Sequence, residues 1–340
     1  MSSIGRYNSI TDVNGIKVGH FSDNDSLTGV TVILTPEGSV GGVDVRGGSP
    51  GTRETDLLSP VNRIQRIDAV CLCGSSAFGL NSVGGVMKYL EEKRIGHPVR
   101  DGMVVPIVSA AVIFDLGRGK SNIHVGESSG YQGCENAGTG STLQGNYGAG
   151  LGALSGGYKG GVGTASEILD DGVTVGAITI VNSSGLAFDT ESGGFYAGGL
   201  ERNGEFGDLK ENLKALYVPR PKPKWHQAQH TTIGIVATNL ALDKPQITKI
   251  AQMAHDGLAR AIYPAHTMFD GDTIFAISTG EKSVEGLENN ERDRLITQVG
   301  VSAADSFARA IVHGLISAES VGNYICHRDA FPGAYKIFGS

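Results

Sequence analysis

The sequence predicts a mixed α/β fold in which sheets stack on one another and helices cover the outside. Short runs of apolar and β-branched residues recur along the chain, as is typical of strands. Two long segments in the second half carry apolar residues at helical spacing. Several strands come before two strand–helix units near the C-terminus, an order typical of layered α/β domains. The 340 residues, 40% hydrophobic and 19% charged, suffice for a sizeable core.

The expected elements follow from local patterns. Strands are expected at residues 15–20, 29–35, 67–73, 104–115, 173–181, from 231 onward and at 274–278. Helices are expected at about 80–94, from 243 to about 263, and at 289–317. The second helix has Asp243 as a cap, Pro245 in its first turn, and an apolar face with Ile247, Ile250 and Leu258. Residues 186–217 are expected to form a loop with short elements.

Composition excludes several classes of protein. The net charge is −7 and no basic face is evident, so nucleic acid is not an expected partner. The N-terminus lacks the apolar core of a signal peptide, and no apolar run is long enough to span a bilayer. Four cysteines without metal-ligand spacing fit a reduced compartment, and we expect a cytoplasmic protein. Cys71 and Cys73 are expected to point to opposite faces of their strand.

The chain changes character at Thr231. Upstream, Pro219, Pro221 and Pro223 alternate with basic residues, which favours an extended, solvated linker. Directly after His230 the residues become β-branched and apolar, as in a buried strand. A linker therefore leads straight into a core strand, and a cut at this border would leave the strand intact.

Such a cut would have a chemical use. A threonine hydroxyl is a poor nucleophile unless a base lies beside it, and an N-terminal threonine carries its own base, the α-amine. A simpler interpretation is a loop followed by a strand that begins with Thr, because Thr favours strands. The stretch alone leaves both interpretations open.

A second candidate group is Asp270-Gly271-Asp272, just before the strand at 274–278. Residues i and i+2 point the same way in extended structure, so both carboxylates could address one site. Close like charges raise one pKa, which would give a proton acceptor and a proton carrier near neutral pH. An Asp-Gly turn and a cation site are alternatives, although two carboxylates are few for calcium. His266 has no partner at metal-ligand spacing, so no metal is expected.

Three further features have both a structural and a functional interpretation. The Gly/Ser turn at 74–79 joins a strand to a helix and could bind an anion, although it lacks a phosphate-loop lysine. Lys159 stands alone in a glycine run, either on the surface or as a charge in a pocket. Asn182 ends a strand, as a turn former or as an oxyanion donor.

Taken together, these residues resemble the self-cleaving DmpA/P1 aminopeptidases, peptidase family S58, which also contain the nylon-oligomer hydrolases. The resemblance covers nearly the whole chain. The second half is most similar to the nylon-oligomer (6-aminohexanoate-oligomer) hydrolase branch, which uses Thr where the aminopeptidase branch uses Ser. The matching motifs are Gly15–His20, Arg46–Asp56, Gly74–Leu80, Lys159–Ser166, Thr231–Ile233, His266-Thr267 and Asp270–Thr273.

The resemblance implies a single αββα sandwich of the N-terminal-nucleophile-hydrolase type over residues 1–340. It implies a precursor cut between His230 and Thr231 into fragments 1–230 and 231–340 that stay together. Family members assemble as homo-oligomeric rings, and no cofactor is implied. By matching position, Thr231 is the nucleophile, Asp270 and Asp272 orient its amine and hydroxyl, Asn182 is an oxyanion donor, and Lys159 and His266 line the pocket.

Two positions depart from the family pattern. His230 precedes the expected cut, where the nylon hydrolases have Asn and the aminopeptidases usually have Gly. Phe114 stands where the family often has a Tyr whose hydroxyl contacts the reacting carbonyl. Tyr147 is a candidate to supply the missing hydroxyl.

The leading hypothesis is therefore an amide hydrolase acting on small amides, on peptides with free N-termini, or on linear ω-amino-acid oligomers. One alternative is acyl transfer of the ornithine-acetyltransferase type, which also uses a self-generated N-terminal Thr. Another is a non-catalytic protein whose glycine loops bind a small anion, and metal-dependent hydrolysis is a fourth hypothesis.

Overall fold

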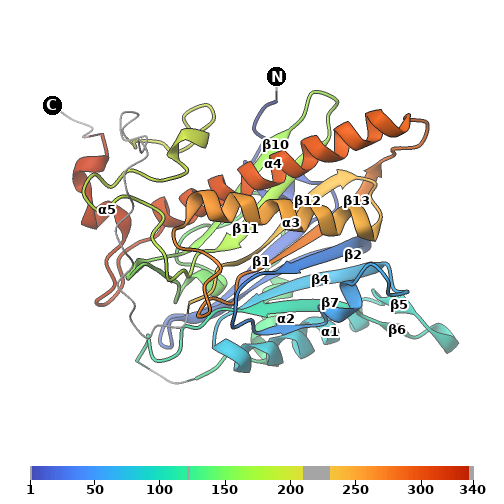
Figure 1. Cartoon of the computed structure of the whole chain (residues 1–340). Coiled ribbons are helices and arrows are strands. Elements are labelled where there is room, and N and C mark those ends of the chain that lie inside the picture. The colour runs from blue at the N-terminus through green and yellow to red at the C-terminus, as the bar shows by residue number, and fades with distance from the viewer. Residues whose placement is uncertain (1, 121–122, 210–229, 337–340) are drawn as a thin grey trace.

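The computed structural model describes residues 2–120, 123–209 and 230–336 (Figure 1). The prolines expected to form a linker before Thr231 lie outside these residues. Nine strands form one hydrogen-bonded sheet, in which β1 (Lys17–Asp23) pairs only with β2. The others run in the order β10 (Val162–Ile168), β11 (Thr174–Ile180), β12 (Ile233–Leu240), β13 (Thr273–Lys282), β2 (Thr28–Val45), β4 (Arg66–Cys73), β7 (Val108–Val112) and β3 (Thr52–Arg53).

The long strand β2 belongs to two halves of this sheet. Its first half pairs with β1 and β4, and its second half, from Val40 to Val45, pairs with β13. The register against β4 shifts between Leu34 and Ser39, and such an irregularity bends a strand. A buried cluster contains residues of both halves, so the halves pack face to face. Its members include Ile33, Leu72, Ile178, Ile235 and Phe275.

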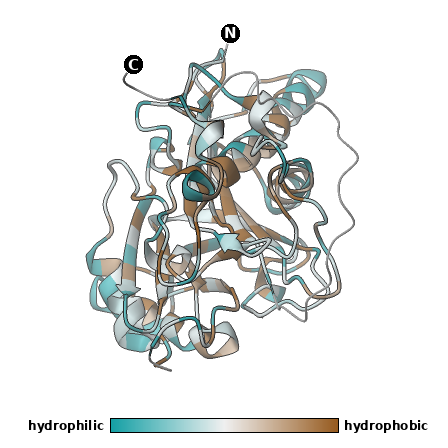
Figure 2. Cartoon of the chain, turned by 90° about the vertical axis from the view of Figure 1, so that its left-hand side faces the viewer, coloured by the Kyte–Doolittle hydropathy of each residue, from teal (hydrophilic) through white to brown (hydrophobic). Residues whose placement is uncertain are grey.

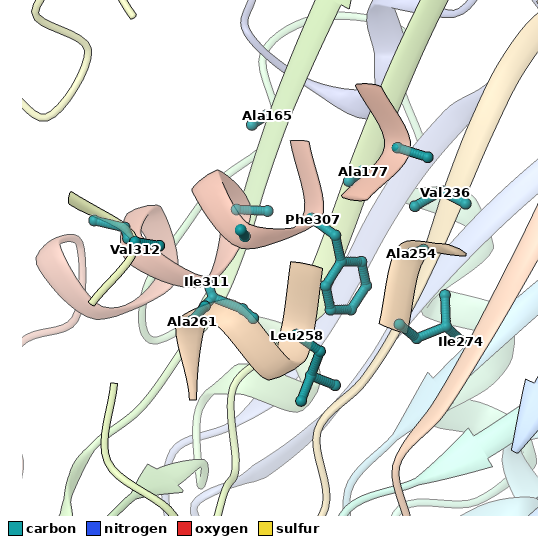
Figure 3. Close-up of a cluster of buried hydrophobic side chains, with 14 of the residues drawn as sticks. Ala165, Ala177, Val236, Ala254, Leu258, Ala261, Ile274, Phe307, Ile311 and Val312 are labelled. Carbon is teal, nitrogen blue, oxygen red and sulfur yellow. The ribbon is translucent and has the colours of Figure 1, made fainter. Parts of the chain in front are cut away.

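Helices cover both outer faces of this double layer (Figure 1). The helices α3 (Lys244–Ala261) and α4 (Asn289–Ile316) pack on the β10–β13 half. On the β4–β7 half lie α1 (Ser82–Glu92) and α2 (Glu127–Glu135). Figure 3 shows the buried cluster in which Phe307 of α4 and Leu258 of α3 lie together with Val236 and Ile274 of the sheet. The expected αββα sandwich is therefore confirmed.

Strand β12 shows why its sequence suits a middle layer. Ile233, Ile235 and Ala237 face the other half of the sheet, while Val236 and Leu240 face the helices. Both faces are buried, so the strand consists of apolar and small residues on both sides. Figure 2 shows the same pattern for the whole fold, with hydrophobic strands inside and hydrophilic loops outside.

The smaller elements lie around this frame. Two short ribbons pair β5 (His97–Pro98) with β6 (Val104–Val105), and β8 (Leu154–Ser155) with β9 (Tyr158–Lys159). A last short helix, α5 (His327–Ala330), follows α4. The described part of the expected loop, 186–209, contains only a short 3-10 turn at Gly198–Leu200, and Phe188, Phe195 and Phe206 anchor it in the core.

The chain contains 51 glycines, and close contacts between helices require some of them. A Cβ added to Gly257 of α3 would lie 1.9 Å from the carbonyl oxygen of Ala304 in α4. A Cβ on Gly85 of α1 would lie 1.7 Å from the carbonyl oxygen of Glu127 in α2. No side chain fits at either crossing, so each helix pair requires glycine there.

Helix α4 is long and contains an apolar stretch. Of the described helices it alone has the length and composition to cross a membrane. Of its most apolar window, 83% is buried inside this fold, as expected of a core helix.

The two strand cysteines correct one expectation. Cys71 and Cys73 lie in the same buried cluster, with their sulfur atoms 3.3 Å apart. The prediction that they point to opposite faces was wrong, because residues i and i+2 share a face of a strand. Both are free thiols.

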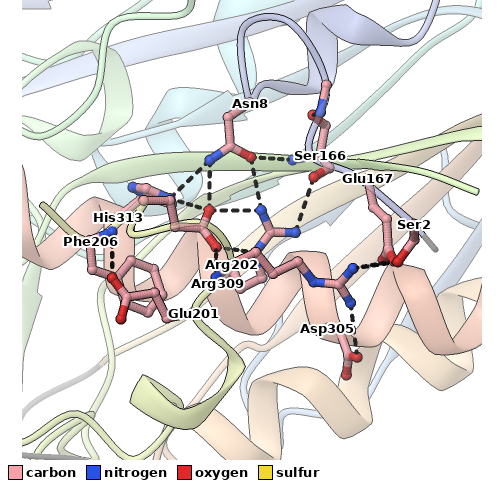
Figure 4. Close-up of polar contacts among 12 residues, drawn as sticks. Ser2, Asn8, Ser166, Glu167, Glu201, Arg202, Phe206, Asp305, Arg309 and His313 are labelled. Carbon is pink, nitrogen blue, oxygen red and sulfur yellow. Dashed lines mark hydrogen bonds and ion pairs between the residues drawn. The ribbon is translucent and has the colours of Figure 1, made fainter. Parts of the chain in front are cut away.

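A buried polar network attaches the loop before the linker to α4 (Figure 4). Glu205 accepts hydrogen bonds from Arg309 at 2.6 Å and from Asn8 at 2.6 Å, and it lies 2.9 Å from Nε2 of His313. Arg309 is fully buried. Burial alone would raise the pKa of Glu205, but the bonds from His313 and Arg309 lower it to about 2.

Replacing Glu205 by glutamine is expected to destabilise the fold. The change leaves the buried Arg309 charge without its counter-ion, which costs about 3 kcal/mol of unfolding free energy. The wild-type pKa is lowered, so this stabilisation is present above pH 4.5 and lost as pH falls toward 2. Urea denaturation at several pH values measures it. The exposed change Glu285→Gln is the control, and equal stability of both variants would contradict the prediction.

Candidate active site

Thr231 lies two residues before the first residue of β12, Ile233. Its Oγ1 donates a hydrogen bond to the carbonyl oxygen of His230, 2.7 Å away, and accepts one from the N–H of Gly271 at 3.1 Å. Its own N–H donates to the carbonyl oxygen of Asn182. The residue is only 6% exposed. The hydroxyl is therefore held in one place, next to the peptide bond that precedes it.

Strand pairing explains this position. Strands β12 and β13 are parallel neighbours, and the pairing continues outward as a bridge between His230 and Asp270. Since parallel strands start at the same edge of a sheet, the residues just before β13 lie beside those just before β12. The structure thus brings Asp270, Gly271 and Asp272 to Thr231.

The Asp272 carboxylate bonds to Thr232, the residue after Thr231, and the Asp270 carboxylate bonds to Thr267. Asp272 accepts the N–H of Thr232 at 2.9 Å with Oδ1, and the N–H of His266 at 2.9 Å with Oδ2. Oδ2 also lies 2.8 Å from Nδ1 of His266. Asp270 accepts the N–H and hydroxyl of Thr267, at 2.9 and 2.6 Å. The group that bonds to the Thr231 hydroxyl is the Gly271 N–H between them, and the roles expected for the carboxylates remain predictions.

A glycine loop fastens the aspartate segment from the other side. Ser49 N–H donates to the carbonyl oxygen of Asp270 at 2.8 Å, and Arg46 N–H to that of Asp272 at 2.9 Å. A Cβ on Gly47 would lie 2.3 Å from main-chain atoms of both aspartates. Gly47 therefore allows the two main chains to touch, and the contact holds the segment that carries both carboxylates.

Burial is the main cause that raises the pKa of Asp270, and the charge of Asp272 adds to it. A raised carboxyl pKa means that the folded protein loses stability as pH rises above the ordinary value of 3.8. The Asp270→Asn variant is therefore expected to melt at least as high as wild type at neutral pH, with a flatter pH profile.

The same variant is expected to lose about 100-fold in amide hydrolysis, because the segment that carries the Gly271 N–H would no longer be held in place, and a misplacement of about 1 Å costs about this much. Calorimetric melting across pH and a hydrolysis assay test the two halves, with the exposed Asp171→Asn as control. Parallel loss of stability and activity would mean that Asp270 is structural.

Asn182 contacts Thr231 through its main chain and also carries a side-chain amide. It is fully buried, and its main-chain oxygen accepts the Thr231 N–H. Its side-chain Oδ1 accepts hydrogen bonds from Arg118 at 2.7 Å and from the N–H of Leu154 at 3.0 Å. Its Nδ2 points toward the carbonyl oxygen of Phe114 at a long 3.4 Å. The residue that accepts the Thr231 N–H thus also carries a side-chain amide donor, the kind of group that an oxyanion site uses.

Lys159 is buried rather than on the surface. Its ammonium donates to the carbonyl oxygens of Gly150 at 2.9 Å, Ala153 at 3.2 Å and Gly160 at 2.6 Å. Burial, helped by the charge of Arg118, lowers its pKa to about 7. Its described bonds hold the turn that leads to Leu154, next to Asn182.

Of the remaining candidates, three lie near Thr231 and one, Tyr147, does not. His230 is 8% exposed, and burial followed by the charge of Arg118 lowers its pKa to about 4, so it is neutral at pH 7. His266 bonds to Asp272, and its ring lies 4.8 Å from that of His255. Phe114 meets the site through its carbonyl oxygen. Tyr147 is 43% exposed and lies with His20 in a separate hollow, so the structure does not bring it to Thr231.

Sequence reasoning missed Arg118 and the part that Gly271 plays. The signal for Arg118 was present, because it stands between Gly117 and Gly119 as Lys159 stands in its glycine run. In the three described ranges, no three His, Cys, Asp or Glu side chains gather as ligands for a metal ion.

The double sheet between helices, with a buried threonine at the start of a central strand, places the protein in the class with the N-terminal-nucleophile-hydrolase fold. The structure of an L-aminopeptidase D-Ala-esterase/amidase from Ochrobactrum anthropi, a variant of that fold, matches with a TM-score of 0.69. It is 22% identical over 97% of this chain and 93% of its own. A β-aminopeptidase of Burkholderia sp. matches with a TM-score of 0.68 and 23% identity, covering 98% and 96%.

The chain belongs to peptidase family S58, whose model matches residues 8–327, and so to the hydrolases of amide bonds. It is 45% identical to an uncharacterized aminopeptidase of Mycobacterium tuberculosis, over 96% of this chain and 99% of that one. It is 30% identical to a 6-aminohexanoate-oligomer endohydrolase of Kocuria sp., over 91% and 86%. The expected family is thus confirmed.

Proposed function

We propose that this protein is a self-processing amide hydrolase whose nucleophile, Thr231, becomes an N-terminus when the His230–Thr231 bond is cut. The observation that carries the proposal is the position of the Thr231 hydroxyl, which donates to the carbonyl oxygen of that same bond at 2.7 Å. A hydroxyl in this place needs little movement to reach the carbonyl carbon. The products would be the fragments 1–230 and 231–340.

Self-cleavage would proceed by an acyl shift. Oγ1 of Thr231 attacks the carbonyl carbon of His230, the peptide bond to Thr231 nitrogen breaks, and an ester joins the two residues. Water then hydrolyses the ester, which leaves a carboxylate on His230 and a free α-amine on Thr231. The reaction needs only the His230 carbonyl, and the neutral imidazole of His230 adds no charge to the site.

The freed amine would then serve each substrate. With a pKa of about 7.7–8.0 it is partly unprotonated at neutral pH and can take the proton of Oγ1. Oγ1 attacks the substrate carbonyl, Nδ2 of Asn182 donates to the oxyanion, and the amine product leaves. Water clears the acyl-enzyme. Asp272 would keep Thr232 aligned throughout, and Asp270 would hold the segment that carries Gly271.

Substrates are inferred from the relatives. We propose peptides and small amides with free N-termini, or linear 6-aminohexanoate oligomers, since the relatives are named as aminopeptidases and as an endohydrolase of such oligomers. We also propose a cytoplasmic homo-oligomer, a tetramer or larger ring of processed units, which light scattering after size exclusion would test.

Intact-mass measurement of the purified protein tests the proposal. We expect two chains, and N-terminal sequencing of the smaller one should begin at Thr231. Fully active protein that consists of one uncut chain would rule out the mechanism.

A further inference from the structure

The loop after β7, residues 115–120, places the guanidinium of Arg118 beside Asn182. At one end of the loop, Asp115 accepts hydrogen bonds from the Thr28 hydroxyl at 2.7 Å and from the N–H of Ser75 at 2.6 Å. At the other end, Lys120 N–H donates to the carbonyl oxygen of Asp25 at 2.7 Å. A Cβ on Gly119 would lie 2.4 Å from that same oxygen, so the loop packs tightly there. Residues 115–120 are thus fastened at both ends.

Arg118 lies between these anchors, and its guanidinium reaches Asn182. Nη1 donates to Oδ1 of Asn182 at 2.7 Å and also to the carbonyl oxygen of Gly152. Gly152 in turn packs against Asp115, because a Cβ on it would lie 2.9 Å from Cβ of Asp115. The contact to Asn182 therefore belongs to a closed arrangement of main chain and side chains.

This contact decides which way the Asn182 carboxamide faces. A guanidinium can only donate, and so can the N–H of Leu154, so both must face the oxygen end of the amide. The Nδ2 end is then turned the other way, where its acceptor among the described residues is Phe114 O at a long 3.4 Å. The opposite rotamer would set two donors against the amide nitrogen, so Arg118 excludes it.

The charge of Arg118 has a second effect. Burial lowers the pKa of Arg118 to about 10, with the charge of Asp115 acting in the opposite direction, so the side chain is a cation at neutral pH. A cation at Oδ1 draws electron density from the carboxamide and makes its N–H a stronger donor. The same charge contributes to the lowered pKa values of His230 and Lys159, so its field extends across the site.

We propose that Arg118 is a positioning residue of the hydrolytic site, which orients the Asn182 carboxamide and polarises its Nδ2 toward the developing oxyanion. The inference rests on the proposed function, in which Asn182 is the oxyanion donor. Arg118 itself touches neither the nucleophile nor the reacting carbonyl. The proposed effect on kcat passes through Asn182, and a double-mutant cycle separates it from the effect of the Arg118 charge on His230 and Lys159.

A double-mutant cycle between the two residues is the test. The variants are Arg118→Gln, Asn182→Ala and the combination of both, together with Arg118→Lys, which keeps the charge and one donor. The change Arg260→Gln, in an exposed ion pair with Asp305, is the matched control. Self-cleavage is followed by intact mass, and kcat and KM are measured on an aminoacyl p-nitroanilide and normalised to the cleaved fraction. Thermal melting of each variant reports its stability.

We expect Arg118→Gln to lower kcat and the rate of self-cleavage about 10- to 100-fold, up to the effect of one oxyanion donor, with KM changed less than threefold. Arg118→Lys should recover part of the rate. In the Asn182→Ala background, the further loss of Arg118 should cost less than threefold. Arg260→Gln should behave as wild type.

The outcomes separate the two ideas. If Asn182→Ala leaves cleavage and kcat unchanged, the proposed oxyanion role is wrong, and the positioning role of Arg118 falls with it. If Asn182→Ala is inactive but Arg118→Gln retains wild-type kcat, only the inference about Arg118 is overturned. Additive losses, or a change confined to KM or to melting, would also overturn it, since Arg118 would then act on substrate or on stability.

Discussion

Replacing Thr231 by valine is expected to abolish self-cleavage and to lower amide hydrolysis at least about 1,000-fold, because the nucleophilic oxygen is removed while the shape is kept. The neighbouring Thr232→Val variant is the matched control. Thr232 is also buried, and among the described residues its hydroxyl has no hydrogen-bond partner. Removing an unsatisfied buried hydroxyl should be neutral or stabilise the protein by about 1 kcal/mol.

The two valine variants are compared by intact mass and by a hydrolysis assay on the same preparation. Thr231→Val should remain one chain, while Thr232→Val should be cut and active. A third variant, Thr231→Ser, keeps a hydroxyl and should be cut. Cleavage of Thr231→Val at the same bond would show that another group attacks it.

Adding one methyl group at Gly271 is expected to be nearly as damaging. A Cβ there would lie 2.9 Å from Oγ1 of Thr231 and 2.8 Å from the carbonyl oxygen of Ser49, closer than real Cβ atoms come. Either the hydroxyl or the aspartate loop must move. A misplacement of this size costs about 100-fold in rate. Since Gly271 does not have a positive φ, the alanine itself is not strained.

The Gly271→Ala variant is tested by the rate of self-cleavage and by kcat. Gly199→Ala is the control, because a Cβ at Gly199 meets nothing within 4 Å. Unchanged cleavage in Gly271→Ala would indicate that the Gly271 N–H does not position the hydroxyl.

The sequence predicted those parts of the fold that local patterns encode. The strand at 173–181 and the helices from 243 and 289 are confirmed as β11, α3 and α4, because β-branched and amphipathic stretches leave few alternatives. The order of the elements predicted stacked sheets with outer helices, and the family resemblance specified the αββα sandwich. The expected strand at 104–115 is divided, with β6 and β7 on either side of Pro106.

Helix α2 and strand β10 were not predicted, because glycine and other small residues give these segments no clear hydrophobic pattern. Helix α2 packs through Gly130, whose Cβ would lie 2.0 Å from the carbonyl oxygen of Ser82, so no apolar stripe is visible. Strand β10 lies in a run of small residues because its Gly163 packs directly against the main chain of Ala310 in α4. In both cases the packing surface is main chain, which hydrophobic periodicity does not detect.

From the sequence, only those site residues could be predicted that stand out within a single short segment. Thr231 and the Asp270–Asp272 pair are visible locally, and parallel pairing of β12 with β13 joins them. The contact between Arg118 and Asn182 spans 64 positions and depends on how two loops fold onto the sheet. The spacing of residues along the chain does not predict such a contact.

The interior position of β12 and β13 has a consequence for a severed chain. On one side β12 pairs with β11, and on the other β13 pairs with β2, so the shorter piece lies between strands of the longer one. After scission, denaturation would release two polypeptides, and renaturation would become a bimolecular encounter that slows on dilution. The mature enzyme would then owe its lifetime to a high barrier against opening rather than to reversible equilibrium.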